Sequence, residues 1–287
     1  MNFEEYQKAK SGILAADLTN RVCWKFSGAD ACRYLNGQVT NDIASLKETS
    51  SLYAAVTNHK GKMEGDVWIT RFKDSFYLDA DESLQESLAK RLERYIVADD
   101  VTIKPMDFQV YHVLGENITL TFPEEVRKIS SHRWGEKGWD LWLPADVAWS
   151  PLCASEVIWE FIRIENGIAR WGHEMTHDTL PPEANIEKRA ISYAKGCYIG
   201  QEVIARIKSI GHVNKHLCRL EAENYSLPQC PEDILNNEKK IGAITTAVAW
   251  DERKKVFALG IVQRQFIQSG QILHSHSNSW KILEDKS

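Results

Sequence analysis

Residues 195–202, K-G-C-Y-I-G-Q-E, form the most informative stretch of this chain. The stretch places Cys197 two residues after Lys195, includes two glycines, and leads directly into helix-forming sequence. The thiolate is the reactive form of cysteine, and both a nearby lysine and a helix N-terminus favour it over the neutral thiol. Cys197 is therefore a candidate reactive group and Lys195 its candidate activator or anion clamp. The alternative is a cysteine that only fills space in the core.

The residues after this stretch have the periodicity of a helix. Ile199, Val203 and Ile207 recur at intervals of four, as on one face of an amphipathic helix. Hydrophobic patterns elsewhere predict helices at 28–36, 82–96 and 154–164, and strands at 22–27, 51–58, 63–72, 76–79, 101–104, 110–114, 217–223, 241–250 and 256–263, with a hairpin at 133–142. The fold class is therefore predicted to be α+β, with a β-rich C-terminal end.

The motif K-G-C-Y-x-G-Q-E resembles the signature of the YgfZ family. Members of that family are folate-binding proteins that support iron–sulfur proteins, and they are related to the aminomethyltransferase (T-protein) of the glycine cleavage system. Further blocks resemble the family in the expected order, at residues 17–21, 27–31, 34–42, 58–62, 163–168, 172–175 and 180–185. The resemblance covers most of residues 12–215.

This resemblance implies a fold and a function. The expected fold is a T-protein-like ring or cloverleaf of three domains around a central funnel, ending in a barrel-like domain. The expected boundaries are 1–105, 106–215 and 216–287. The expected ligand is tetrahydrofolate or a one-carbon derivative. The expected role is assembly or repair of iron–sulfur proteins, among which tRNA-modifying enzymes are possible clients, and the expected partners are those client or assembly proteins.

The resemblance also implies residues for a folate site. Glu165 stands where the T-protein family places its pterin-binding glutamate, and a carboxylate at a predicted helix C-terminus is otherwise disfavoured by the helix dipole. The other candidates for folate contact are Asn36, Gln38, Asp66, Tyr198, Gln201, Glu202 and Arg206.

The chain departs from T-protein at two positions. The pair Gly65-Asp66 stands where T-protein has two acids, and Cys197 replaces an acidic residue. Exchanging a carboxylate for a thiol changes the chemistry from positioning an amine to redox, metal contact or covalent capture. Aminomethyl or one-carbon transfer is therefore an alternative function, and a non-catalytic scaffold in which Cys197 only packs is another. Whether the protein is an enzyme stays open.

A second motif points to different chemistry. Residues 173–177, H-E-M-T-H, match the H-E-x-x-H pattern, in which two histidines one helical turn apart bind zinc and the glutamate acts as a base. The pattern requires a helix, and Gly172 before it and Pro181-Pro182 after it leave little room for one. A zinc hydrolase is therefore the weakest alternative.

Composition limits the classes of partner. The formal net charge of −5 argues against a general nucleic-acid surface, which needs a basic stripe. Positive charge does concentrate near the signature, at Lys188, Arg189, Lys195, Arg206, Lys208 and Lys215. Such a cluster suits an anionic small molecule, such as a polyglutamylated folate tail, as well as it suits a solvated surface.

The cysteines and the apolar runs give three further expectations. The 6 cysteines include no C-x-x-C pair, so no disulfide framework, zinc ribbon or permanently bound metal is expected. The first residues lack the features of a signal or transit peptide. No apolar run approaches membrane-spanning length, so we expect no membrane contact and a cytoplasmic location.

Overall fold

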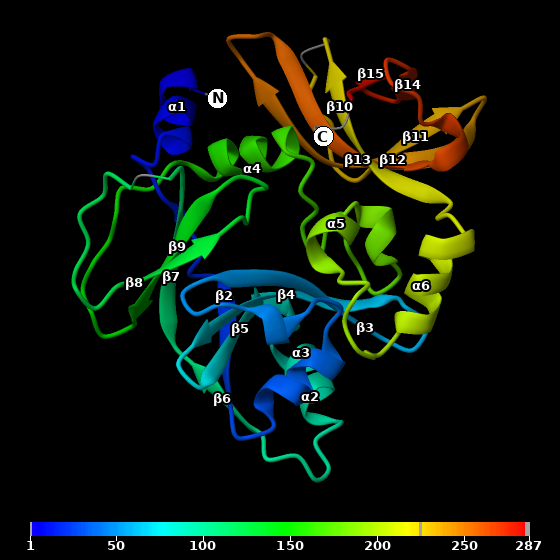
Figure 1. Cartoon of the computed structure of the whole chain (residues 1–287). Coiled ribbons are helices and arrows are strands. Elements are labelled where there is room, and N and C mark those ends of the chain that lie inside the picture. Colours follow the sequence, from blue (N-terminus) through cyan, green and yellow to red (C-terminus); the bar gives the residue numbers. More distant parts are fainter. Residues whose placement is uncertain (1, 117, 224–225, 285–287) are drawn as a thin grey trace.

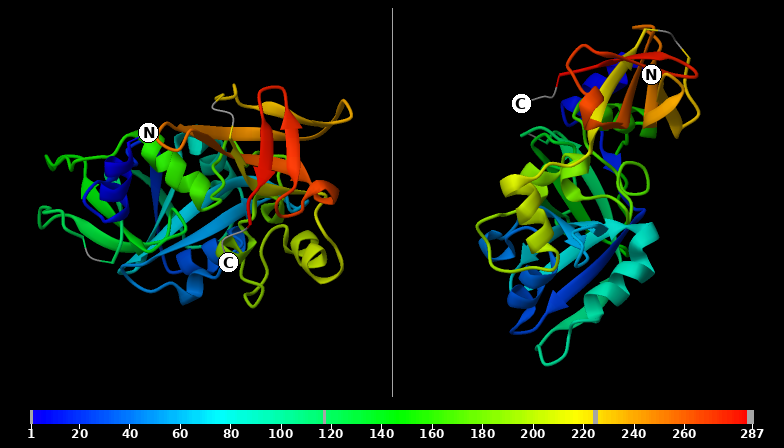
Figure 2. Two further views of the ribbon diagram at one scale, coloured as in Figure 1. Left: turned by 90° about the horizontal axis from the view of Figure 1, so that it is seen from above. Right: turned by 90° about the vertical axis from the view of Figure 1, so that its right-hand side faces the viewer.

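The computed structural model describes residues 2–116, 118–223 and 226–284, and this part of the chain builds three β-sheets (Figure 1). In the side view of Figure 2 the C-terminal barrel lies at one end of the molecule and the first sheet with its helices at the other. The structure is a mixed fold in which helices are few. Among the helices of the described residues, none combines the length and the hydrophobicity needed to span a bilayer.

The first sheet has five antiparallel strands in the order β3-β4-β5-β2-β6. Their bounds are β2 (Arg21–Ser27), β3 (Ser51–Thr57), β4 (Met63–Phe72), β5 (Ser75–Asp81) and β6 (Thr102–Met106). Helices α2 (Ala31–Gln38) and α3 (Gln85–Glu93) cover one face of this sheet (Figure 1). Because both faces are covered, the centre of β4 is buried without interruption from Gly65 to Thr70.

The second sheet has four strands in the order β1-β7-β9-β8. Their bounds are β1 (Ala16–Asp17), β7 (Phe108–Leu114), β8 (Arg127–Ser131) and β9 (Gly138–Pro144). Helices α1 (Phe3–Lys10) and α4 (Glu156–Glu165) pack beside it through Ala9, Leu114, Ile158 and Ile162. The apolar residues of α4 recur at helical spacing, so the helix buries one face here and presents its polar residues elsewhere.

The third sheet closes into a barrel, in the order β10-β13-β12-β11-β14-β15 with β15 paired back to β10. Its strands are β10 (Lys215–Ala222), β11 (Glu232–Asn236), β12 (Lys239–Trp250), β13 (Lys255–Gln263), β14 (Ile272–Ser275) and β15 (Ser279–Ile282). Leu220, Ile244, Ala258 and Trp280 are completely buried in its core. The predicted β-rich C-terminal end is therefore a closed barrel.

The signature segment lies between the first sheet and the barrel. It is preceded by α5 (Glu187–Ala190) and continues into α6 (Gln201–Ile210), the predicted amphipathic helix. Gly200 has φ +89°, and a Cβ there would lie 2.5 Å from the carbonyl oxygen of Asn58. Only glycine therefore lets the signature approach the turn between β3 and β4 so closely.

Several of the predicted elements differ in their bounds, most of them by one or two residues. The helix expected at 82–96 is α3 (Gln85–Glu93) preceded by a 3₁₀ turn at Glu82–Leu84, and the helix expected at 28–36 is α2 (Ala31–Gln38). The hairpin expected at 133–142 has its turn at residues 132–137, where Gly135 takes φ +78°. The sequence pattern did not reveal α1, α5, β1, β8 or the short barrel strands. These elements are short, so their hydrophobic periodicity is too weak to be recognised in the sequence.

A buried ion network joins the first sheet to the second. Arg133, in the turn between β8 and β9, places Nε 2.9 Å from both carboxylate oxygens of Asp140, and its Nη1 lies 3.1 Å from Oδ1 of Asp79. Asp79 on β5 also pairs with Arg21, and Asp140 on β9 lies 2.7 Å from Nδ1 of His112. Burial alone would raise the pKa of Asp140, but Arg133 and His112 lower it to about 2.

A second buried network attaches the barrel to α4. Glu174 lies 2.7 Å from Nη1 of Arg163 on α4, and it accepts hydrogen bonds of 2.7 Å from the hydroxyls of Thr245 and Thr246 on β12. Arg163 in turn donates to the Thr246 hydroxyl at 2.9 Å. Burial opposes ionisation of Glu174, but Arg163 and the two hydroxyls lower its pKa below the ordinary value. The carboxylate therefore holds the barrel through charge-assisted hydrogen bonds.

Replacing Arg133 by methionine should destabilise the protein strongly. The change leaves two buried carboxylates without their shared cation, and removing one partner of a buried pair costs about 3–5 kcal/mol. Thermal unfolding followed by circular dichroism should show a clearly lower Tm for R133M. The matched control is R33M, since the Arg33 side chain is 69% exposed. Equal Tm values for the two variants would contradict the structural role of Arg133.

Replacing Glu174 by glutamine should loosen the barrel. The amide keeps the shape but loses the charge that Arg163 and both threonines bind, which should cost roughly 1–3 kcal/mol. Because the pKa of Glu174 is lowered in the folded state, the deficit should be complete above the ordinary glutamate pKa of about 4.3 and shrink as the pH falls below it. Chemical unfolding at several pH values measures it, with the 88% exposed Glu86 as the E86Q control. A deficit that does not depend on pH would refute this account.

Candidate functional site

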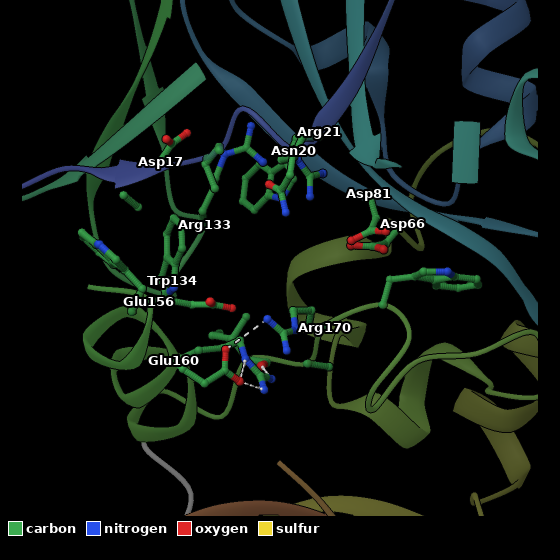
Figure 3. A pocket seen from close by; sticks show the side chains of 18 of the residues that line it. Asp17, Asn20, Arg21, Asp66, Asp81, Arg133, Trp134, Glu156, Glu160 and Arg170 are labelled. Atoms are coloured by element: carbon green, nitrogen blue, oxygen red, sulfur yellow. Dashed lines mark hydrogen bonds and ion pairs between the residues drawn. The ribbon is translucent and has the colours of Figure 1, made fainter. Parts of the chain in front are cut away.

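A cavity of about 470 Å³ lies where the first sheet, the second sheet and α4 meet (Figure 3). Segments far apart in the sequence contribute to its lining: residues 16–21, Tyr53, Asp66, Trp68, Asp81, Arg133, Trp134, Ala154, the polar face of α4, residues 168–171 and Arg189. Enclosed volumes of this size, with a few convergent polar groups, are typical of sites for small organic ligands.

Aromatic rings form much of the cavity wall. Tyr53 and Trp68 project from neighbouring strands with their ring centres 5.0 Å apart, and Trp134 and Trp159 approach equally closely. Trp171 also lines the cavity. Such walls present flat, polarisable surfaces, which suit a flat heteroaromatic ring.

Asp66 is the most buried carboxylate of the cavity, with 9% of the residue exposed. The Tyr53 hydroxyl donates a hydrogen bond of 3.0 Å to its Oδ2, and Asp81 lies beside it (Figure 3). Burial raises the pKa of Asp66, and the nearby Asp81 adds to the increase, while Arg21 and the Tyr53 hydrogen bond oppose it. The carboxyl can accept hydrogen bonds from a ligand when it is charged, and it can also donate one when it is protonated.

Strand geometry directs positions 65 and 66 of β4 to opposite faces of the sheet. Successive residues of a strand face opposite sides, so Asp66 and Trp68 face the cavity while Gly65 faces the helix layer. A Cβ on Gly65 would lie 3.0 Å from a methyl carbon of Leu84. A carboxylate at position 65 would therefore be directed into apolar packing, away from the cavity.

Five arginines line the cavity, and four of them pair with carboxylates. Arg21 pairs with Asp79, Arg133 with Asp79 and Asp140, Arg163 with Glu160 and Glu174, and Arg170 with Glu160. Figure 3 shows Arg170 and Glu160 directed toward one another across the cavity floor. These four guanidinium groups hold the walls in place.

Of the residues predicted for the site, Asp66 lines this cavity, whereas the others do not. Asn36 and Gln38 lie at the end of α2, where Asn36 accepts a hydrogen bond of 2.9 Å from the backbone of Ile43. The Gln38 side chain accepts one of 2.8 Å from Arg91. Both amides therefore take part in local packing around α2.

The signature residues also gather around α2 rather than around the cavity. Lys195 donates from Nζ to the carbonyl oxygens of Asn36 and Val39, and its Nζ lies 5.0 Å from the Tyr198 ring centre. Burial lowers the pKa of Lys195 to about 8. Cys197 is a free thiol with an exposed side chain. The α6 residues predicted to shape this edge are Gln201, which is half-buried, and Glu202 and Arg206, which are exposed.

Glu165 lies at the last residue of α4, outside the cavity lining. It accepts a hydrogen bond of 3.0 Å from the Tyr6 hydroxyl and lies 3.8 Å from Nζ of Lys10. The α4 residues that do reach the cavity are Glu156, Trp159, Glu160 and Arg163. Their spacing of three and four residues marks one helix face, and that pattern could have identified them from the sequence.

The H-E-x-x-H segment does not form the helix that a zinc site would require. Residues 172–174 form a turn, and the glutamate of the motif is the buried Glu174 that binds Arg163 and the barrel threonines. His173 lies 2.7 Å from Nη2 of Arg170, and burial lowers the pKa of this histidine. The zinc-hydrolase alternative is therefore wrong in its structural premise.

Known proteins with similar sequences and folds agree with this architecture. The model of the GCVT N-terminal domain matches residues 2–115. An uncharacterized protein of Haemophilus influenzae is 29% identical over 264 residues, covering 88% of this chain and 90% of that protein. The tRNA-modifying protein YgfZ of Escherichia coli is 28% identical over 287 residues, with 88% of each chain covered.

A solved structure supports the same assignment at the level of the fold. The glycine cleavage system aminomethyltransferase T of Bartonella henselae superposes with a TM-score of 0.81, covering 98% of this chain and 88% of that one, at 17% identity. The chain is therefore similar in sequence to YgfZ, matches the GCVT N-terminal domain over residues 2–115, and has the aminomethyltransferase T fold.

Proposed function

We propose that this chain is a cytoplasmic protein that binds tetrahydrofolate, or a one-carbon derivative of it, in the central cavity. The observation that carries the proposal is the combination of an aromatic-walled cavity of about 470 Å³ with the buried carboxyl of Asp66. A pterin ring is flat and presents adjacent hydrogen-bond donors along one edge. Rings such as Tyr53 and Trp68 suit its faces, and a carboxyl such as Asp66 suits its edge.

We further propose that the protein serves the assembly or repair of iron–sulfur proteins, including enzymes that modify tRNA. This part rests on the relation to YgfZ, whose E. coli member is named as a tRNA-modifying protein. The exposed Cys197 supports it, because a thiol on the surface is accessible to a protein partner while a ligand occupies the cavity. The proposal thus assigns two sites, a folate cavity and a thiol surface.

Aminomethyl or one-carbon transfer is the second candidate function. The fold similarity to aminomethyltransferase T favours it. Two observations weigh against it. Asp66 stands alone where T-protein has paired acids, and the signature residues do not line the cavity, since Lys195 donates to carbonyl oxygens at the end of α2. Turnover of an aminomethyl donor in the presence of tetrahydrofolate would establish this alternative.

Tetrahydrofolate should quench the intrinsic tryptophan fluorescence, because four tryptophans line the cavity. The variant D66N should bind it about 10-fold more weakly or worse, since loss of a charged hydrogen-bond acceptor costs roughly 1.5–3 kcal/mol. The matched comparison is E165Q, which changes a carboxylate outside the cavity and should leave the Kd unchanged. A loss of affinity in E165Q but not in D66N would locate the pterin elsewhere, and no binding by the wild type would refute the proposal.

Cys197 should be required for the assembly or repair of iron–sulfur proteins but not for folate binding. In E. coli cells lacking their own YgfZ, the wild-type chain should restore the activity of cluster-containing tRNA-modifying enzymes and C197A should not. The control is C153A, which removes another exposed cysteine. If C197A restored the enzyme activities as well as the wild type does, the thiol would have no chemical role and the protein would act as a non-catalytic scaffold.

A further inference from the structure

Arg189 differs from the other arginines of the cavity. The other four each lie within 4 Å of a carboxylate, whereas no carboxylate among the described residues lies that close to the Arg189 side chain. The sequence alone grouped Arg189 with a basic surface cluster, but the structure places it in the cavity wall. The cavity therefore contains a cation whose charge the protein does not neutralise by a direct ion pair.

The protein nevertheless holds the Arg189 side chain in a defined position. Its Nη2 donates to the carbonyl oxygens of His132 and Arg133, at 2.8 Å and 3.1 Å. The guanidinium carbon lies 5.2 Å from the ring centre of Tyr53 and 5.8 Å from that of Trp68, so the group is stacked against the aromatic wall. Nε and Nη1 have no hydrogen-bond partner within the described part of the chain. A fixed guanidinium with two free donor atoms is preorganised for a ligand acceptor.

Asp66 and Arg189 flank the same ring. Tyr53 donates its hydroxyl to Asp66 while its face supports Arg189, so an acceptor and a donor are held on one side of the cavity. Among the described residues, no ion pair within 4 Å joins the Asp66 carboxyl to the Arg189 guanidinium; their hydrogen bonds go to Tyr53 and to backbone carbonyl groups. Both side chains line the cavity, so each can bind a ligand edge there.

The complementary ligand edge has an N–H beside a carbonyl oxygen. The carboxylate accepts from the N–H, and the guanidinium donates to the oxygen. A cyclic amide in a flat ring has this order of groups. If the same position carries an amino group instead of the oxygen, its N–H atoms face the guanidinium donors, and buried donors on both sides are left unpaired.

We propose that Asp66 and Arg189 together recognise the lactam edge of the ligand ring, and that Arg189 selects a ring carbonyl over an amino group. This inference rests on the proposed function, in which the ring is the 4-oxo pteridine of a folate. Arg189 is a specificity-determining residue here because each of the other cavity arginines is already paired with a carboxylate, namely Asp79, Asp140, Glu160 or Glu174.

Folic acid and aminopterin test this inference, because aminopterin has an amino group in place of the oxygen at position 4 and, with it, a bare N3 in place of the N3–H that faces Asp66. Wild-type protein should bind folic acid at least about 10-fold more tightly than aminopterin, in line with specificity for a hydrogen-bonded group. In R189M the affinity for folic acid should fall by about 10-fold or more, whereas that for aminopterin should stay the same or rise, so that the preference shrinks by at least this factor; the remaining preference comes from the N–H that Asp66 accepts. Calorimetric titration measures both constants.

Two further variants complete the experiment. R189K keeps the charge but loses the planar pair of donors, and its preference should lie between those of wild type and R189M. It also keeps the test decisive if R189M does not fold. The matched control is R94M, which changes an exposed arginine on the far side of the sheet layer and should keep the wild-type preference.

The outcomes separate this inference from the proposed function. Equal wild-type affinities for the two ligands, or a preference that stays at its wild-type size in R189M and R189K, overturn the role of Arg189 and leave folate binding intact. A wild type that binds tetrahydrofolate but neither folic acid nor aminopterin also overturns it alone. A wild type that binds none of the three overturns the inference and the proposed function together.

Discussion

The cavity depends on the guanidinium of Arg133, which connects the first sheet to the second. It binds Asp79 of the first sheet and Asp140 of the second at the same time, and one side of it faces the cavity. Burial makes each of these charges costly without its partners, so the two sheets are held in one relative position. Trp68 of the first sheet has its ring centre 4.9 Å from the Arg133 guanidinium, and Trp134 follows Arg133 in the chain, so this group positions both aromatic walls.

Beside Asp17, Asp81 and Glu156, the cavity lining contains two classes of charged group. In the first class are arginines and carboxylates that neutralise one another and fix the walls. Asp66 and Arg189 form the second class, because they bind tyrosine and backbone carbonyl groups and keep bonding capacity toward the interior. In such a cavity the ion-paired residues fix the walls, and other residues bind the ligand. Asp66 and Arg189 are the groups that keep hydrogen-bonding capacity for it.

The sequence predicted the architecture, and it named site residues that the structure places in different parts of the molecule. Long periodic segments such as β4 and β12 and the amphipathic α4 were recognised close to their true bounds, because apolar burial repeats along them. Asp66 was named as a site residue and lines the cavity. Glu165 was named from resemblance, but it lies two positions after Arg163, about 200° around the helix, and so faces away from the residues that reach the cavity. Arg189 carries no periodic signal, and only the folded chain brings it to Tyr53.

The attachment of the barrel has a consequence for the occupied cavity. Arg163 lines the cavity and also donates hydrogen bonds to the Thr246 hydroxyl of the barrel and to the carboxylate of Glu174. A ligand that binds to Arg163 would therefore contact the same side chain that attaches α4 to β12 of the barrel. By linkage, such a ligand would stabilise the docking of the barrel by the same free energy with which the docked barrel favours the ligand.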